Sequence, residues 1–382
     1  MHGVWNLLLG LPRLRHKRDK GEALMGGNRL YLKGNEALAY GALEAGLNAY
    51  FAYPITPSSE IPETLAKEFG SKKYPDFKFF LQAASELEAI NMVIGAAAGG
   101  VRAMTATSSP GFSLKQEGLS YAACNELPFL IVDICRAGPG LGNLGPEQSD
   151  YFQATKGGGH GNYRLLVLAP ATVQEMAAFP RIAFDLAFKY RNPVLILGDA
   201  FTGQLKEDVD FPQLSPEKYD TSSWATTGAA GRRPHIINSL ELDYQVHFKH
   251  IERIYEKYRR AQENEVRFEE YRTEDAETVL VAFGIASRIA KGAVNKLRSK
   301  GIKVGLFRPI TLWPFPTTQI KKLASEGRRF LDIELSTGQM YEDVKLAVGD
   351  GVTVDFLGKW GGVVPSEAEI TSKLKRLEVV AQ

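Results

Sequence analysis

The regular alternation of short apolar runs with longer helical patterns is the feature that most limits how this chain can fold. Helical patterns cover residues 35–45, 86–98 and 173–189. Strand-like runs cover 49–53, 101–107, 129–134, 165–168 and 194–197. This order predicts an α/β fold whose parallel sheet is covered by helices on both faces. Several runs are apolar throughout, as expected of strands buried on both sides.

A second α/β unit of similar pattern follows closer to the C-terminus. Its expected helix covers 287–301, and its expected strands cover 278–284, 303–310, 330–335 and 354–358. The segment before it opens with a polar, proline-bearing stretch and continues as a charge-rich sequence that predicts one or two long exposed helices. The expected organisation is therefore a disordered extension (1–27), a first domain (28–210), a helical, charged connector (211–272) and a second domain (273–382).

Composition excludes several classes of protein. The 46 Lys and Arg residues nearly balance the 44 Asp and Glu residues, so the chain lacks the basic excess that is typical of nucleic-acid-binding proteins. No run reaches the roughly 18 apolar residues of a membrane span. The two cysteines, Cys124 and Cys135, are expected in the core of a protein from a reducing compartment, the cytoplasm. The six histidines form no HxxxH or HExxH pair, so no zinc site is expected.

The first residues combine a short apolar run with a basic cluster that follows it. A secretory signal has the opposite order, with the basic residues first. Two interpretations stay open: a disordered tail, or an upstream start codon with the true start at Met25.

The segment YPITPSSEIPE, residues 53–63, is the sharpest local motif. Pro54 and Pro57 hold the chain extended around Thr56, and Ser58 or Ser59 is positioned to cap the next helix. Because the motif follows an apolar strand, it lies at the carboxyl edge of the sheet, where ligands of open α/β sheets bind. A plain strand-to-helix turn is the alternative.

The segment 84–100 begins an apolar helix. Ser85 and Glu88 form an S-x-x-E capping box, which gives Glu88 a structural explanation. Glu86 has no structural explanation beyond a favourable interaction of its charge with the helix dipole. Since the helix is otherwise apolar and is expected to be buried, Glu86 is also a candidate for a shifted pKa and a role in catalysis.

Residues 136–161 form a glycine-rich segment with eight glycines. Long irregular segments of this kind are often functional, and glycine allows a ligand to approach the backbone closely. Arg136 follows a strand directly and could hold a carboxylate bidentately, whereas a surface salt bridge is the alternative. His160 is either a ligand contact or part of a capped turn.

Several motifs are missing. The chain has no P-loop and no G-x-S-x-G elbow, and GLGNLG (140–145) does not open a helix as a dinucleotide-binding loop would. Gly198–Asp199–Ala200 lacks the continuation of a GDG-type diphosphate and magnesium motif. Two thiols are too few for a cubane iron–sulfur cluster.

Five segments together resemble the α subunit of 2-oxoacid:ferredoxin oxidoreductases, in the order typical of the family. They are YPITPSSEIPE, SELEAI (85–90), TSSPGFSLKQEGLSYAACNELP (107–128), RAGPGLG (136–142) and QATKGGGHGNYR (153–164). The resemblance covers 32–205 and resumes from 278 to the C-terminus. It is strongest to the 2-oxoglutarate and 2-oxoisovalerate (branched-chain) enzymes, without deciding between them.

The resemblance implies a fold and a reaction. The fold is a thiamine-diphosphate-binding, pyrimidine-type domain followed by a smaller transketolase C-terminal-like domain. The enzymes decarboxylate a 2-oxoacid, transfer the acyl group to coenzyme A and pass the electrons to ferredoxin. A β subunit holds the diphosphate, Mg²⁺ and an iron–sulfur cluster, and a γ subunit, sometimes with a small ferredoxin-like subunit, completes the complex.

The resemblance also implies roles for individual residues. Glu86 matches the glutamate that shares a proton with N1′ of the aminopyrimidine and so promotes ylid formation. Thr56 matches a substrate-contacting threonine, and Arg136 matches the arginine that grips the substrate carboxylate. Ile55 and Pro57 would line the cofactor pocket. A cation at Lys156 or His160 would suit the second carboxylate of 2-oxoglutarate, although both residues also fit a structural role.

Two other functions remain as alternatives. A nicotinamide-dependent dehydrogenase fits the α/β pattern but not the missing dinucleotide motif. A non-catalytic scaffold subunit fits the fold but does not explain why Thr56, Glu86 and Arg136 are all present.

Overall fold

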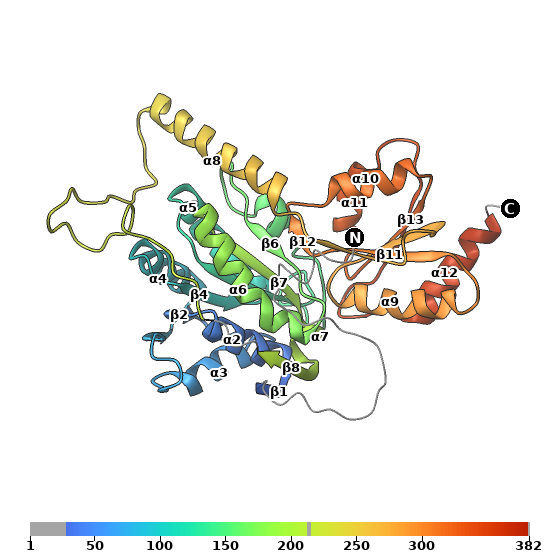
Figure 1. The fold of residues 1–382 in the computed structure, drawn as a ribbon, viewed down its shortest axis with the longest axis horizontal. Coiled ribbons are helices and arrows are strands. Elements are labelled where there is room, and N and C mark those ends of the chain that lie inside the picture. The colour runs from blue at the N-terminus through green and yellow to red at the C-terminus, as the bar shows by residue number, and fades with distance from the viewer. Residues whose placement is uncertain (1–27, 212–214, 381–382) are drawn as a thin grey trace.

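The computed structural model describes residues 28–211 and 215–380, which form two α/β domains (Figure 1). The expected extension at 1–27 lies outside the described residues. In the described part, no helix is long and apolar enough to cross a membrane.

The first domain is built on a seven-stranded sheet in the order β12-β6-β7-β5-β4-β2-β3. All its strands run parallel except β12, which pairs antiparallel with β6. The strands are β2 (Ala49–Ala52), β3 (Phe79–Gln82), β4 (Ala103–Thr107), β5 (Leu130–Cys135), β6 (Leu166–Leu168), β7 (Val194–Asp199) and β12 (Thr311–Trp313). This confirms the predicted parallel sheet. The expected strands that lie in this sheet each match an observed one to within two residues.

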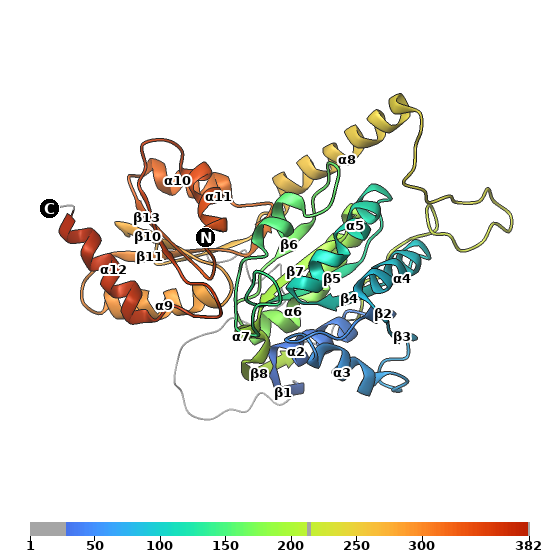
Figure 2. The same cartoon turned by 180° about the vertical axis from the view of Figure 1, so that it is seen from behind.

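Helices cover both faces of this sheet, as Figures 1 and 2 show from opposite sides. Along β5, Leu130, Val132 and Ile134 pack with the helices of one face, whereas Ile131 and Cys135 pack with those of the other. The first face carries α2 (Gly34–Glu44), α3 (Glu60–Glu68) and α6 (Val173–Tyr190), and the second carries α4 (Glu86–Ala98) and α5 (Ser109–Cys124). A short helix α7 (Ala200–Gln204) follows β7, and β1 (Asn28–Lys33) pairs with β8 (Lys206–Phe211) in a separate ribbon.

Local capping explains where α4 begins, but not where α3 begins. Ser85 accepts a hydrogen bond from the backbone N–H of Glu88, as the capping box predicts, and α4 covers the expected 86–98. The predicted cap of α3 is wrong. Ser59 makes no side-chain capping bond, and the Ser58 hydroxyl instead donates to the carbonyl of Ile55 at 2.7 Å, so it closes the preceding turn.

The second domain has a five-stranded sheet in the order β14-β13-β10-β11-β9. Its strands are β9 (Phe268–Tyr271), β10 (Thr278–Val281), β11 (Val304–Pro309), β13 (Arg329–Glu334) and β14 (Val354–Gly358). Its helices are α9 (Gly284–Arg298), α10 (Thr317–Ser325), α11 (Gln339–Val348) and α12 (Glu367–Val380). Because β9 pairs antiparallel with β11, this sheet begins before residue 273, the expected domain boundary.

The connector contains one long helix in its described part, α8 (Tyr244–Asn264). Residues 215–243 before it form no helix or strand. Trp224 and Ala225 in this segment are buried against the first domain, whereas another part of it projects from the body as an arm (Figures 1 and 2). The expected exposure of this helix holds for its first half only. Ile254, Lys257, Tyr258 and Ala261 in its second half are buried.

A buried ion-pair network joins the two domains. Arg308 on β11 is 5% exposed and binds both carboxylate oxygens of Glu175 on α6, at 2.8 and 2.7 Å. Its Nε lies 3.0 Å from Glu269 on β9, which also pairs with Lys291 at 2.7 Å. Burial alone would raise the pKa of Glu269, but the charges of Arg308 and Lys291 outweigh it and hold this pKa below its usual value.

We predict that Glu269→Gln lowers the free energy of unfolding by about 1–3 kcal/mol at pH 7, because it leaves buried donors without their charged partner. A carboxylate with a depressed pKa stabilises the fold above its unfolded pKa, about 4.3, and this contribution is lost as the pH falls through the folded value. The difference from wild type should therefore shrink below about pH 4. Urea unfolding across pH tests this, with the exposed Glu277→Gln as a control that stays within about 0.5 kcal/mol. A pH-independent difference would contradict the electrostatic explanation.

Candidate active site

The carboxyl ends of three adjacent strands bring the predicted residues to one edge of the first sheet. β2 leads into Tyr53–Pro57, β4 leads into α5, and β5 ends directly before Arg136. Ser109 in the first turn of α5 joins two of these segments. Its hydroxyl accepts a hydrogen bond from the backbone N–H of Arg136 at 3.0 Å and lies 3.2 Å from the carbonyl oxygen of Arg136. The N-terminus of α5 is therefore fixed against the end of β5.

The structure brings Arg136 and Thr56 into contact. The Arg136 side chain is almost buried, and it donates to the carbonyl of Thr56 at 2.8 Å and to the carbonyl of Leu141 at 3.3 Å. Its Nε is buried without a hydrogen-bond partner. A guanidinium has five N–H donors, so Arg136 has donors left for a carboxylate.

Three residues of the PITPS stretch (54–58) differ in exposure. Thr56 is exposed, Ile55 is half-buried and Pro57 is buried. Asn35 on α2 donates a hydrogen bond to the carbonyl of Pro57 at 2.7 Å and so fixes the motif to α2. Thr56 is thus held by its backbone from two sides while its side chain stays accessible to a ligand.

Glu86 lies on the other side of the α5 N-terminus. It is 5% exposed, and its carboxylate forms no hydrogen bond or ion pair with the residues that the structure describes. Gly111 packs directly against it, because a Cβ built on Gly111 would lie 2.4 Å from Glu86 Oε1 and 2.1 Å from Thr107 Oγ1. A buried carboxylate without a protein partner is suited to exchange a proton with a basic ring nitrogen, so it fits the aminopyrimidine of thiamine diphosphate.

Further buried acids lie under the α5 N-terminus. Asp150 accepts hydrogen bonds from the Ser109 hydroxyl and, at 2.6 Å, from the amide of Gln153. Burial raises the pKa of Asp133 well above its usual value, and the neighbouring Asp150 carboxylate raises it further. These surroundings favour the protonated, neutral form of the Asp133 carboxyl.

Lys156 and His160 are not joined to this group. Lys156 on the π-helix η1 (Gln153–Gly157) forms an ion pair with Asp343 on α11 of the second domain. Asp343 also accepts from the Tyr151 hydroxyl at 2.6 Å. The His160 ring packs edge-on against Tyr121, about 15 Å along α5 from Gly111 at 1.5 Å per residue. Their substrate-binding roles stay predictions, and the contacts described here are structural.

Gly158 and Gly159 have a packing explanation, whereas Gly157 adopts a positive φ of 94°. A Cβ on Gly158 would lie 2.6 Å from the side chain of Gln116, and one on Gly159 would lie 2.4 Å from the Gln116 carbonyl oxygen. The Gly159 N–H also donates to the Tyr163 hydroxyl at 2.9 Å. These glycines let the loop lie flat on α5, so close approach to a ligand is not needed to explain them.

Part of the site's surroundings is apolar and exposed. Tyr53, Leu87 and Leu114 are 40–49% exposed, on the segment after β2, on α4 and on α5. The expectation that α4 is buried holds for one side of the helix only, because the side that carries Leu87 faces outward. An exposed apolar surface of this kind is typical of a site completed by another subunit.

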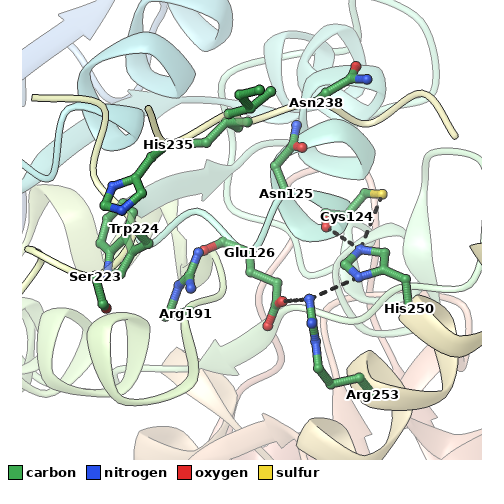
Figure 3. A pocket seen from close by; sticks show the side chains of 12 residues that line it. Cys124, Asn125, Glu126, Arg191, Ser223, Trp224, His235, Asn238, His250 and Arg253 are labelled. Atoms are coloured by element: carbon green, nitrogen blue, oxygen red, sulfur yellow. Dashed lines mark hydrogen bonds and ion pairs between the residues drawn. The ribbon is translucent and has the colours of Figure 1, made fainter. Parts of the chain in front are cut away.

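A separate pocket lies at the opposite end of α5, between Cys124, the arm and α8 (Figure 3). His250 Nε2 lies 2.8 Å from the Cys124 carbonyl oxygen, and Arg253 pairs with Glu126 at 2.6 Å. Cys135 is buried as expected of a core cysteine, but Cys124 is only half-buried. Burial and the charge of Glu126 raise the pKa of the Cys124 thiol. The contacts of His250 and Arg253 hold α8 against the end of α5.

Sequence reasoning missed Ser109, Gly111 and Lys115, although all three lie in the segment 107–128. Gly111, Lys115 and Gly118 are spaced i, i+4, i+7, which places them on one helix face, and this spacing was the available signal. The described ranges contain no group of three or more His, Cys, Asp or Glu that could hold a metal ion.

Comparison with known proteins agrees with this geometry. Residues 40–273 match a family described as pyruvate flavodoxin/ferredoxin oxidoreductase, thiamine-diphosphate-binding, and 276–370 match pyruvate:ferredoxin oxidoreductase core domain II. The ketoisovalerate oxidoreductase subunit VorB of Methanothermobacter marburgensis is 51% identical over 91% of this chain and 97% of its own length. The 2-oxoglutarate synthase subunit KorA of the same organism is 34% identical over 90% and 98%.

A solved structure shows the same fold. It is a 2-oxoglutarate:ferredoxin oxidoreductase from Magnetococcus marinus, with a TM-score of 0.83 at 24% identity, and the match covers 93% of this chain and 66% of that one. The family matches cover both domains, and the relatives cover nearly the whole chain. This chain therefore belongs to the thiamine-diphosphate-dependent 2-oxoacid:ferredoxin oxidoreductase family, which confirms the resemblance found in its motifs.

Proposed function

We propose that this chain is the catalytic α subunit of an enzyme that oxidatively decarboxylates a 2-oxoacid. The products are an acyl-CoA, CO2 and reduced ferredoxin. The observation that carries the proposal is the convergence of Glu86, Arg136 and Thr56 around the N-terminus of α5. A scaffold subunit without chemistry would not need a buried, unpartnered carboxylate beside an almost buried arginine with spare donors.

Glu86 acts as the proton-exchanging group. Thiamine diphosphate, when bound, supplies the nucleophilic carbon and the electron sink for loss of CO2. Glu86 exchanges a proton with N1′ of the aminopyrimidine, and Ile55 and Pro57 line the same pocket. Gly111 and Thr107 pack against the carboxylate, which limits its rotation and keeps it at one position.

Arg136 and Thr56 orient the substrate. The remaining N–H donors of Arg136 bind the carboxylate that leaves as CO2. The Thr56 side chain is exposed beside that guanidinium, so its hydroxyl is positioned to donate to the substrate. Because Arg136 is itself held by the Thr56 carbonyl, the two substrate contacts move as one unit.

The favoured substrate is a branched-chain 2-oxoacid such as 2-oxoisovalerate. Identity is higher to the ketoisovalerate subunit than to the 2-oxoglutarate subunit, 51% against 34%. Leu141, whose carbonyl binds Arg136, is 82% exposed and offers an apolar surface. Lys156 is already paired with Asp343, so a second substrate carboxylate would have to displace that pair.

The rest of the machinery belongs to partner subunits in this proposal. A β subunit holds the diphosphate, Mg²⁺ and an iron–sulfur cluster, and covers the apolar surface beside Glu86. A γ subunit, in some complexes with a small ferredoxin-like subunit, completes the assembly. Residues 28–210 act as the pyrimidine-binding domain and the second domain as its transketolase C-terminal-like neighbour. We expect the complex to work in the cytoplasm.

Glu86→Gln should reduce kcat of the co-expressed complex by about 10²- to 10⁴-fold, because it removes the proton exchange at N1′. Glu88→Gln is the matched control, since Glu88 lies on the same helix with an exposed carboxylate that accepts from the Ala84 N–H. The measurement is anaerobic reduction of a viologen dye with substrate and coenzyme A. Equal activity of the Glu86→Gln and Glu88→Gln complexes would remove Glu86 from the mechanism.

Arg136→Met should lower kcat/KM by about 10- to 150-fold, the equivalent of a lost charge-assisted hydrogen bond worth about 1.5–3 kcal/mol. Arg136→Lys keeps the charge but not the planar fork and should lie between the methionine variant and wild type. Initial-rate kinetics over a range of 2-oxoacid concentrations distinguish the variants. A methionine variant with wild-type kcat/KM would show that the substrate carboxylate binds elsewhere.

A panel of 2-oxoacids tests the substrate assignment directly. We expect dye reduction that requires coenzyme A and is fastest with branched acids. A preference for 2-oxoglutarate would contradict this assignment, and Lys156→Met and His160→Gln would then locate its second carboxylate. If no acid supports reduction by a complex with intact clusters and bound thiamine diphosphate, the scaffold interpretation replaces the proposal.

A further inference from the structure

Lys115 on α5 is a fully buried lysine next to Glu86. Its relative exposure is 0%. Its ammonium contacts the backbone carbonyl oxygen of Glu86 at 3.5 Å, which is the upper limit for a hydrogen bond. Because one long contact to a neutral carbonyl does not offset the loss of hydration of a full charge, Lys115 is costly to the fold in this position.

The packing of α5 on α4 explains how the ammonium reaches this place. Gly111 and Gly118 bring the two helices close together, since a Cβ on Gly111 would lie 2.4 Å from Glu86 Oε1 and one on Gly118 would lie 2.6 Å from Ile90. Lys115 shares their face of α5 and lies between them along the helix. Its side chain therefore extends into the narrow crossing and ends at the first turn of α4, where Glu86 begins the helix.

Glu86 is also the charged group that acts on Lys115. Burial lowers the pKa of Lys115 to about 8, and the negative charge of Glu86 opposes this decrease. Lys115 is thus mainly an ammonium at pH 7. The Glu86 carboxylate forms no ion pair within 4.0 Å in the described ranges, so Lys115 acts on it through its charge across the helix crossing and through its contact with the Glu86 carbonyl.

We propose that Lys115 is a positioning residue that fixes the first turn of α4 and supplies the countercharge for the Glu86 carboxylate. This inference rests on the role of Glu86 proposed above. Lys115 acts only through Glu86 and does not itself touch the substrate or the cofactor. It explains why the chain keeps a buried lysine where an apolar residue would pack at lower cost.

Lys257 on α8 is the matched control. It is 3% exposed, and burial lowers its pKa to about 8 as well. Its ammonium, however, lies 3.5 Å from Glu126 and donates to the Arg191 carbonyl at 3.1 Å. Lys257→Met thus removes a buried lysine of the same kind at the far end of α5, and it should leave kcat unchanged.

The test is Lys115→Met in the co-expressed complex. We expect kcat to fall by about 10- to 100-fold, the size of the effect when a catalytic group is misplaced by about 1 Å. We expect the thermal unfolding midpoint to stay the same or to rise, because an apolar side chain replaces a poorly compensated buried charge. In the Glu86→Gln background, Lys115→Met should cause no further loss, since the two residues act as one unit.

Two measurements on the loaded complex do not depend on turnover. Titration with thiamine diphosphate, followed by protein fluorescence, gives its dissociation constant, which should rise in Lys115→Met. Circular dichroism of the bound aminopyrimidine reports the protonation state of that ring, and its pH dependence should shift in Lys115→Met but not in Lys257→Met. If Lys115 only packed the helices, its substitution would change these two signals only through a loss of stability, so the unfolding midpoint would fall as well.

The outcomes separate this inference from the function it rests on. Suppose that Glu86→Gln abolishes turnover. If Lys115→Met then keeps wild-type kcat and circular dichroism, or if the effects of the two substitutions on kcat add in the double variant, the inference is wrong and the proposed function stands. If Glu86→Gln has no effect, both fail. Should Lys115→Met not fold, Lys115→Gln replaces it, since glutamine retains a donor for the Glu86 carbonyl without the charge, and the same results decide.

Discussion

The contact between the first turn of α5 and its two neighbours organises the site. Gly111 lies against the Glu86 carboxylate on one side, and on the other side the Ser109 hydroxyl accepts from the Arg136 N–H. Because both contacts come from one helical turn, the distance between Glu86 and Arg136, the proposed proton-exchanging and carboxylate-binding groups, is set by a rigid element. Thr56 joins this arrangement because its carbonyl oxygen accepts a hydrogen bond from the Arg136 guanidinium. A small displacement of α5 would therefore disturb all three residues together.

Most of the first sheet could be predicted from sequence, because β2, β4, β5, β6 and β7 are apolar runs followed by a recognisable helix or turn. The edge strand β3 (Phe79–Gln82) was missed, because it has only four residues and is mostly exposed. The site residues could be named from their place at strand ends and from the family motifs. The contacts between these residues could not be predicted. The order β5-β4-β2-β3 places the end of β5 near the end of β2, although some 80 residues separate Thr56 from Arg136 in the chain. Strand order depends on packing between distant segments, which periodicity does not encode.

Segments that cross between the domains were the hardest to predict. Strand β9 belongs to the second sheet although it lies within the segment expected as the connector (211–272), and β12 completes the first sheet although it follows β11. Both are short and have no long apolar run of their own. The glycine-rich segment 136–161 was ambiguous for a related reason. A glycine indicates that another group lies close to the backbone, but sequence does not say which group it is. It can be a ligand or, as at Gly158, the side chain of Gln116.

The distribution of buried charge shows which part of the chemistry this chain prepares alone. Glu86, Lys115 and Arg136 are all below 10% exposure within the single chain, whereas Thr56 and Leu87 face outward. Such groups cost folding free energy, and the ion-pair network around Arg308 and the two continuous cores supply stability elsewhere. The chain therefore holds the Glu86 carboxylate away from water within its own fold. In the proposed function, the exposed side around Thr56 and Leu87 would receive the substrate, and a partner subunit would close the site over groups that are already in place.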